Sequence, residues 1–115
     1  MTPLPPTIRI GPLVFRVTDD RAVHNQGVVD DLHDTYGRIR YSQELIILDP
    51  NQTDAHKRIA LLHEIMHGCW HLGDRSHKND EKAIRSLCAP LLDVLRRNPD
   101  LIAFLLATED EPKDD

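Results

Sequence analysis

The stretch that governs the fold is DAHKRIALLHEIMHGCW, residues 54–70, in which apolar side chains recur every three or four positions. This period is typical of an α-helix that packs a broad apolar face against a core. Asn51 or Thr53 can cap the start of the helix. Gly73 follows soon after its expected end near residue 70. We therefore predict a largely buried helix over residues 54–70.

Histidines and a glutamate gather on one side of this expected helix. With about 100° of rotation per residue, His67 lies about 40° from His63, and Glu64 lies about 100° from it. Imidazoles four residues apart face the same way, so both can bind one tetrahedral metal ion. Residues 63–67 spell H-E-x-x-H, a pattern typical of zinc metallopeptidases. The pattern predicts one zinc ion per chain, with His63 and His67 as ligands and Glu64 as the catalytic acid/base.

A catalytic zinc ion usually has three protein ligands and one open position, so a third ligand must come from elsewhere. The longer pattern H-E-x-x-H-x-x-G-x-x-H does not supply it, because position 70 is Trp. A carboxylate at the start of the following helix is the alternative, and Glu81 is the favoured residue. Asp80, His71 and His77 remain open as alternatives.

A further hydrogen-bond donor usually assists peptide hydrolysis by stabilising the developing oxyanion. Four residues are candidates for this role, and the sequence does not rank them: Tyr36, Tyr41, His71 and Arg85. His71 could instead contact one of the metal-binding side chains without binding the metal itself, or it could be an ordinary surface histidine.

Short β-type segments precede the helix. Residues 7–17 alternate apolar and polar positions around a Gly-Pro break, which predicts a strand pair or one interrupted strand. Residues 36–41 and 44–49 flank Ser-Gln, which predicts a tight hairpin. Residues 19–35 are polar and weakly periodic, so we expect a loop there with at most one helical turn.

Two more helices are expected after the first. Asn79 or Asp80 can cap a helix whose apolar positions run to about residue 95, and Pro90 should kink it. The sequence NPD then breaks the chain before a last short helix over residues 101–106. The predicted fold class is α+β, a small antiparallel sheet followed by a helical bundle that carries the H-E-x-x-H helix.

Length and composition fit one small intracellular domain. The chain has 115 residues, and we expect a flexible segment over 1–6, a single domain over 7–107 and a disordered acidic tail over 108–115. The net charge of -5 argues against binding to nucleic acid or to an anionic membrane. The apolar runs are far shorter than the roughly 20 residues that span a bilayer. With no apparent signal peptide, a cytoplasmic location is expected.

Two cysteines are too few for a disulfide scaffold of this size. Both Cys69 and Cys88 lie in apolar helical patterns, so buried free thiols are predicted.

The stretches YGRIRYSQELIILDPNQTDAHKRIALLHEIMHG and DEKAIRSLCAPLLDVLRRNP resemble a family of small phage and prophage-encoded metallopeptidase-like proteins, which look related to ImmA/IrrE-type zinc peptidases. The resemblance covers roughly residues 8–105. It implies a minimal gluzincin-like fold, with His63, His67 and Glu81 as ligands and Glu64 as the acid/base. The chain departs from the family pattern at Pro90, which interrupts the second helix, and at Arg85, four residues after Glu81, which is not a carboxylate.

Two functions follow as hypotheses. One is a zinc metallopeptidase that acts on a peptide or protein substrate. The segment over residues 44–49 could pair with an extended peptide if it forms an exposed edge of the sheet. The alternative is that this segment is a core strand. The other is a weakly active or inactive module, braced by zinc, that sequesters a regulatory protein. The acidic charge suits a basic regulator in either case. The presence of Glu64 favours the enzyme, and the sequence leaves the oligomeric state undetermined.

Overall fold

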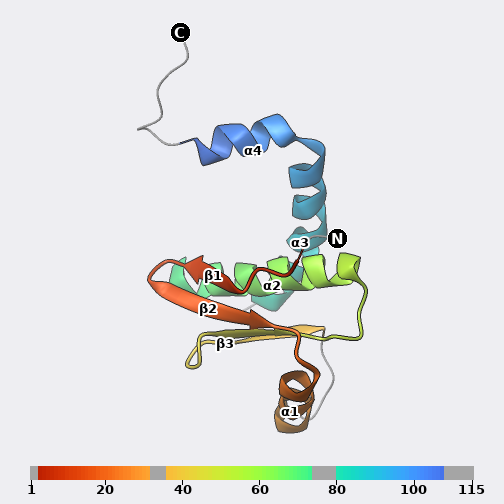
Figure 1. Ribbon diagram of the computed structural model, residues 1–115. Coiled ribbons are helices and arrows are strands. Elements are labelled where there is room, and N and C mark those ends of the chain that lie inside the picture. Colours follow the sequence, from red (N-terminus) through yellow and green to blue (C-terminus); the bar gives the residue numbers. More distant parts are fainter. Residues whose placement is uncertain (1–2, 32–35, 74–79, 108–115) are drawn as a thin grey trace.

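The computed structural model of the chain describes residues 3–31, 36–73 and 80–107, and it has an α+β fold (Figure 1). Within the described residues the predicted strand pair, hairpin and three C-terminal helices are all present, together with one helix that was not expected. The elements are β1 (Thr7–Ile10), β2 (Leu13–Thr18), α1 (Arg21–Asp31), β3 (Gly37–Arg40), β4 (Leu45–Leu48), α2 (Asp54–Gly73), α3 (Asp80–Arg97) and α4 (Pro99–Leu106). Residue 7, the expected start of the domain, begins β1, and the predicted acidic tail lies outside the described residues.

The sheet is mixed rather than wholly antiparallel, with the strand order β1-β2-β4-β3. The strands β1 and β2 form one antiparallel hairpin, and β3 and β4 form the other. The two hairpins meet through β2 and β4, which run parallel. The reason is that β3 begins at the end of the sheet at which β2 ends, so β3 carries the chain back and β4 then runs in the same direction as β2.

The expectation of a loop over residues 19–35 is wrong for most of that segment. Asp20 starts α1, where its Oδ1 accepts the backbone N–H of Val23 at 3.1 Å. His24 fixes the helix to the sheet, since it is 3% exposed and its Nε2 lies 3.6 Å from Oδ1 of Asp49. A tertiary contact thus stabilises a helix whose own apolar pattern is weak. Residues 32–35 lie outside the described residues.

The core lies between the sheet and α2, and it includes Ile46 and Leu48 of β4, a strand whose four residues are all buried. Among the residues of α2, Ala60, Glu64 and Gly68 are the buried ones, spaced four apart along the side that faces the sheet. A Cβ atom at Gly68 would lie 2.6 Å from Cδ1 of Ile10, so the missing side chain permits this close approach. The helix therefore buries a narrow stripe, less than the sequence pattern predicted.

The ends of α2 differ slightly from the prediction. Oγ1 of Thr53 accepts the backbone N–H of His56 at 3.2 Å, so Thr53 caps the helix. The helix runs on to Gly73, one turn further than expected. Cys69 near this end is exposed, contrary to the predicted burial, whereas Cys88 on α3 is buried as predicted.

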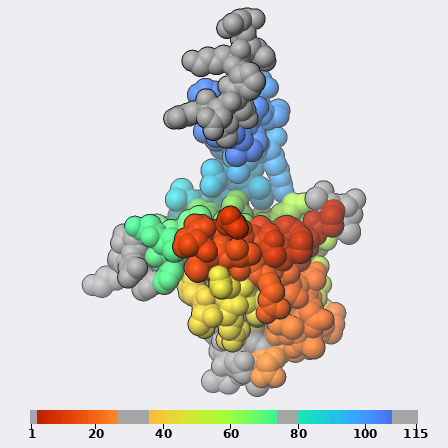
Figure 2. Space-filling model, turned by 60° about the vertical axis from the view of Figure 1, so that its left-hand side comes forward, coloured from red at the N-terminus to blue at the C-terminus, as the bar shows by residue number. Residues whose placement is uncertain are grey.

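Helix α3 packs on α2, and α4 extends away from the sheet (Figures 1 and 2). The helix α3 continues past Pro90 to Arg97. None of the residues of α4 is buried, and Phe104 is 78% exposed. No helix in the described part of the chain is long and apolar enough to cross a membrane.

Ile84 is buried on α3, the helix that packs on α2, and it is 1% exposed. Ile84→Ala is expected to lower the free energy of unfolding by about 2–4 kcal/mol, because it leaves a cavity between the helices. Urea denaturation followed by circular dichroism measures the change. Leu87→Ala, on the exposed side of the same helix, is the matched control and should change stability by less than about 0.5 kcal/mol. Equal effects of the two variants would contradict this packing.

Candidate metal centre

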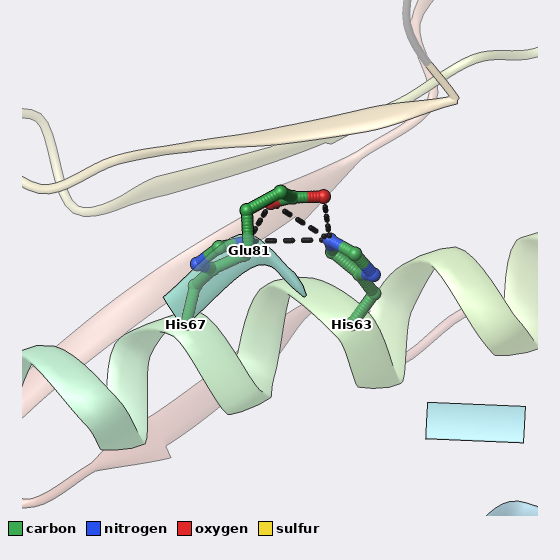
Figure 3. A group of neighbouring side chains, drawn as sticks. All are labelled: His63, His67 and Glu81. Atoms are coloured by element: carbon green, nitrogen blue, oxygen red, sulfur yellow. Dashed lines mark hydrogen bonds and ion pairs between the residues drawn. The ribbon is translucent and has the colours of Figure 1, made fainter. Parts of the chain in front are cut away.

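The side chains of His63, His67 and Glu81 converge on one point (Figure 3). Both imidazoles rise from α2 toward the carboxylate of Glu81, which comes from the first turn of α3. Nε2 of His67 lies 2.6 Å from Oε2 of Glu81, and Nε2 of His63 lies 3.1 Å from Oε1. The two Nε2 atoms are 3.2 Å apart. The structure therefore brings together the three residues that the sequence favoured as ligands.

The chemistry of this group fits zinc. Two imidazole nitrogens and one carboxylate oxygen are a donor set found in catalytic zinc sites. In a tetrahedral site with bonds of about 2.0–2.1 Å, neighbouring donor atoms are about 3.3 Å apart. The separations of 3.2 Å between the imidazoles and 3.1 Å from His63 to Glu81 are close to that value. The contact from His67 to Glu81, at 2.6 Å, is slightly shorter than the length of about 2.7–2.9 Å that is typical of a charge-assisted N–H···O hydrogen bond.

The alternatives for the third ligand occupy other positions. Asp80 contacts the far nitrogen of the His67 ring, with Oδ2 lying 3.3 Å from Nδ1. The ring of His71 stacks on Tyr41 with centroids 4.2 Å apart, outside the converging group. His77 lies outside the described residues. Of the described candidates, Glu81 is the one whose oxygens reach both Nε2 atoms.

The charge on Glu81 is favoured by the two histidines. Partial burial alone would raise the pKa of Glu81, but attraction from His63 and His67, with hydrogen bonds from both rings, outweighs it and lowers the pKa. The guanidinium of Arg85 lies 3.3 Å from Oε1 of Glu81 and adds a further positive charge at the exposed side. Glu81 is therefore an ionised carboxylate at neutral pH, which is the form that binds a metal.

Glu64 lies beside the group but points toward the sheet, and it is 6% exposed. The pKa of Glu64 is raised to about 7, mainly by burial. The positive charges of His67 and Arg38 oppose this rise, and the negative charge of Glu81 adds to it. A Cβ atom at Gly37 would lie 3.5 Å from Cγ of Glu64, so the glutamate lies directly beneath the start of β3. A carboxyl group with a pKa near neutrality can both accept and release a proton, as general acid–base catalysis requires.

An open cleft of about 880 Å³ contains the group and is bounded by β3, α2 and the start of α3. Ile39, Ile59 and Ala60 line its apolar part. The polar part holds the converging residues and Glu64. A cleft of this size can take several residues of an extended peptide.

The four candidate oxyanion donors differ in whether they line the cleft and in which groups they contact. Tyr36 lines the cleft and is 68% exposed, and Arg85 lines it while bound to Glu81. Tyr41 donates its hydroxyl to the carbonyl oxygen of His67 at 3.2 Å, so it anchors the β3–β4 turn to α2. Burial and the carboxylates of Glu64 and Asp80 raise the pKa of Tyr41. His71 stacks on Tyr41 and is not part of the cleft wall.

Two features of this region were missed by the sequence analysis. The contact of Asp80 with Nδ1 of His67 was not expected, although the position of Asp80 beside Glu81 was a usable signal. The strand at the edge of the cleft is β3, not the segment over residues 44–49, because β4 pairs with a strand on both sides. The core interpretation of that segment is the correct one.

Comparisons of the chain with protein-family models, with curated proteins and with solved structures found no match. The interpretation of the centre therefore depends on its residues and their geometry.

Proposed function

We propose that the chain is a zinc-dependent metallopeptidase. The observation that carries the proposal is the convergence of His63, His67 and Glu81 in a cleft, with the buried carboxyl of Glu64 beside them. A zinc ion bound there supplies Lewis acidity and an activated water molecule. The resemblance to small phage-encoded metallopeptidases agrees with this proposal and stays a prediction, as do the cytoplasmic location and the basic regulatory substrate.

Glu64 performs the proton transfers. With a pKa of about 7 it accepts a proton from the attacking water and later delivers that proton to the leaving amine. Its position next to His63 in the chain puts it on the side of α2 that faces β3, where a substrate carbonyl can lie between the strand and the helix. Tyr36 and Arg85 line the same cleft and can donate hydrogen bonds to the developing oxyanion.

The edge strand β3 is suited to hold an extended substrate. Asp49 donates its backbone N–H to the carbonyl of Tyr36 at 2.9 Å, in the same register that pairs Arg38 with Ile47. Because hydrogen-bonding directions alternate along an antiparallel strand, the backbone groups of Gly37 and Ile39 point away from β4. An extended peptide can pair with these groups and pass over Glu64.

Glu64 also separates this proposal from a module in which zinc has only a structural role. Burial of a carboxyl group costs free energy, and a purely structural zinc site has no need of it. Among the described residues three side chains converge, which leaves room for water and substrate. The acidic net charge of -5 would suit a basic partner equally well in both cases.

Proteolysis of unfolded peptides tests the proposed function directly. Protein depleted of metal by a chelator should leave a library of unfolded peptides intact, and addition of one equivalent of zinc should start cleavage that mass spectrometry detects. The His67→Ala variant, purified in the same way, controls for contaminating proteases. Tight zinc binding without cleavage of any peptide would contradict the enzyme and favour the binding module. Cleavage that resists the chelator would point to a contaminant.

A further inference from the structure

Asp80 touches two members of the converging group at once. Its Oδ2 lies 3.3 Å from Nδ1 of His67, and its Oδ1 accepts the backbone N–H of Glu81 at 2.8 Å. The Asp80 side chain is 19% exposed and that of His67 is 13% exposed, so solvent weakens their contact little. One carboxylate therefore links a histidine of α2 to the glutamate of α3.

We propose that Asp80 is a positioning residue, which fixes the ring of His67 and the backbone of Glu81 so that both side chains face the same metal ion. This inference rests on the proposed zinc site. It assigns to Asp80 a role that differs from that of a ligand, because its carboxylate lies on the opposite side of the His67 ring from Glu81.

The chemistry of imidazole supports this role. A neutral histidine that binds a metal through Nε2 carries its proton on Nδ1. An acceptor at Nδ1 therefore selects the tautomer whose Nε2 lone pair is available, and it also fixes the plane of the ring. Asp80 supplies that acceptor for His67, while Nε2 of the same ring points toward Glu81 and His63.

The same carboxylate positions Glu81 through the backbone. Glu81 has a side chain that is 49% exposed, so its rotamer is not fixed by burial. The hydrogen bond from its N–H to Asp80 fixes the first turn of α3, from which the side chain extends. Asp80 thereby limits the freedom of both groups before a metal binds, and preorganisation of this kind raises affinity.

Helix capping is the competing explanation, since an aspartate at the start of a helix stabilises it without any metal. Asp80→Ser separates the two roles. Serine caps a helix nearly as well as aspartate, but its shorter side chain does not reach Nδ1 of His67. Asp93→Ser is the matched control, because Asp93 lies on the same helix and its carboxylate pairs with Arg97 at 2.9 Å.

Zinc affinity of the full chain, measured by competition with a chromophoric chelator, tests the proposal. Asp80→Ser should raise the dissociation constant for zinc by about 10–100-fold while the urea midpoint stays near that of the wild type. Asp93→Ser should bind zinc like the wild type. Asp80→Asn, which keeps the shape and one acceptor oxygen, should recover part of the affinity. The visible spectrum of the Co²⁺-loaded protein should change with Asp80→Ser and not with Asp93→Ser.

Two results would overturn the proposal while the zinc site stands. One is equal zinc affinity in Asp80→Ser and Asp93→Ser. The other is a loss of affinity that accompanies an equal loss of stability and that Asp80→Asn does not recover, which would make Asp80 a helix cap only. Failure of the wild-type chain to bind zinc would overturn the proposed function, and this inference with it.

Discussion

Replacement of His67 by alanine is expected to lower zinc affinity by roughly 10²–10³-fold. A zinc site holds its ion with about 10 kcal/mol or more, so loss of one of three ligands removes about 3–4 kcal/mol. His67 offers one donor atom, Nε2, which lies 2.6 Å from Glu81, while its Nδ1 contacts Asp80. Isothermal titration with zinc measures the affinity, and His63→Ala should behave alike.

The thermal shift caused by zinc should disappear in the same variant. Zinc at about 100 times its dissociation constant stabilises the folded wild-type chain by about 2.7 kcal/mol, and a protein that no longer binds the ion gains nothing. His71→Ala is the matched control on the same helix, because the ring of His71 stacks on Tyr41 outside the group. An equal loss of zinc binding in His71→Ala would contradict the assignment of Glu81 as the third ligand.

Glu64→Gln is expected to lower the rate of peptide cleavage by about 10²–10⁴-fold, the range that general acid–base catalysis contributes. The amide keeps the size of the side chain but accepts no proton. Zinc affinity should change little, because the carboxylate of Glu64 is not among the three converging donors. Cleavage rates at saturating peptide, measured on protein with one equivalent of zinc, give the comparison.

The fold of Glu64→Gln should also persist. The pKa of Glu64 is raised by burial, so an uncharged side chain suits that position at least as well as an ionised one. Glu44→Gln is a suitable control, since Glu44 lies in the β3–β4 turn and its Oε1 accepts the N–H of Val14. Unchanged cleavage by Glu64→Gln would mean that another residue, or another protein in the sample, performs the reaction.

The centre could be predicted because its geometry is local. Two histidines four residues apart lie on the same side of any α-helix, whatever surrounds it. The prediction of Glu81 required one further assumption, that the next helix returns along α2, and in the structure α3 does pack on α2. The contact between Asp80 and Nδ1 depends on the relative rotation of the two helices, which sequence periodicity does not specify.

The sheet was harder to predict because its order depends on contacts between distant residues. Both hairpins follow from short-range turn signals, but the parallel pairing of β2 with β4 joins strands that β3 and the helix α1 separate in the chain. That helix has few apolar positions, and it is fixed by the buried pair of His24 and Asp49, which are far apart in the chain. Cys69 was assigned to the core because its neighbours are apolar, whereas the sheet contacts the stripe of α2 that includes Gly68.

The placement of Glu81 at the very start of α3 has a mechanical consequence. A cation shared by His63 and Glu81 would connect the two helices in the folded state and so oppose their separation. Because α3 packs mainly on α2 and α4, occupancy of the centre would control how firmly the C-terminal third of the molecule is tethered. The amides of α3 would then exchange with solvent more slowly when the ion is present, while those of β1 would be little affected.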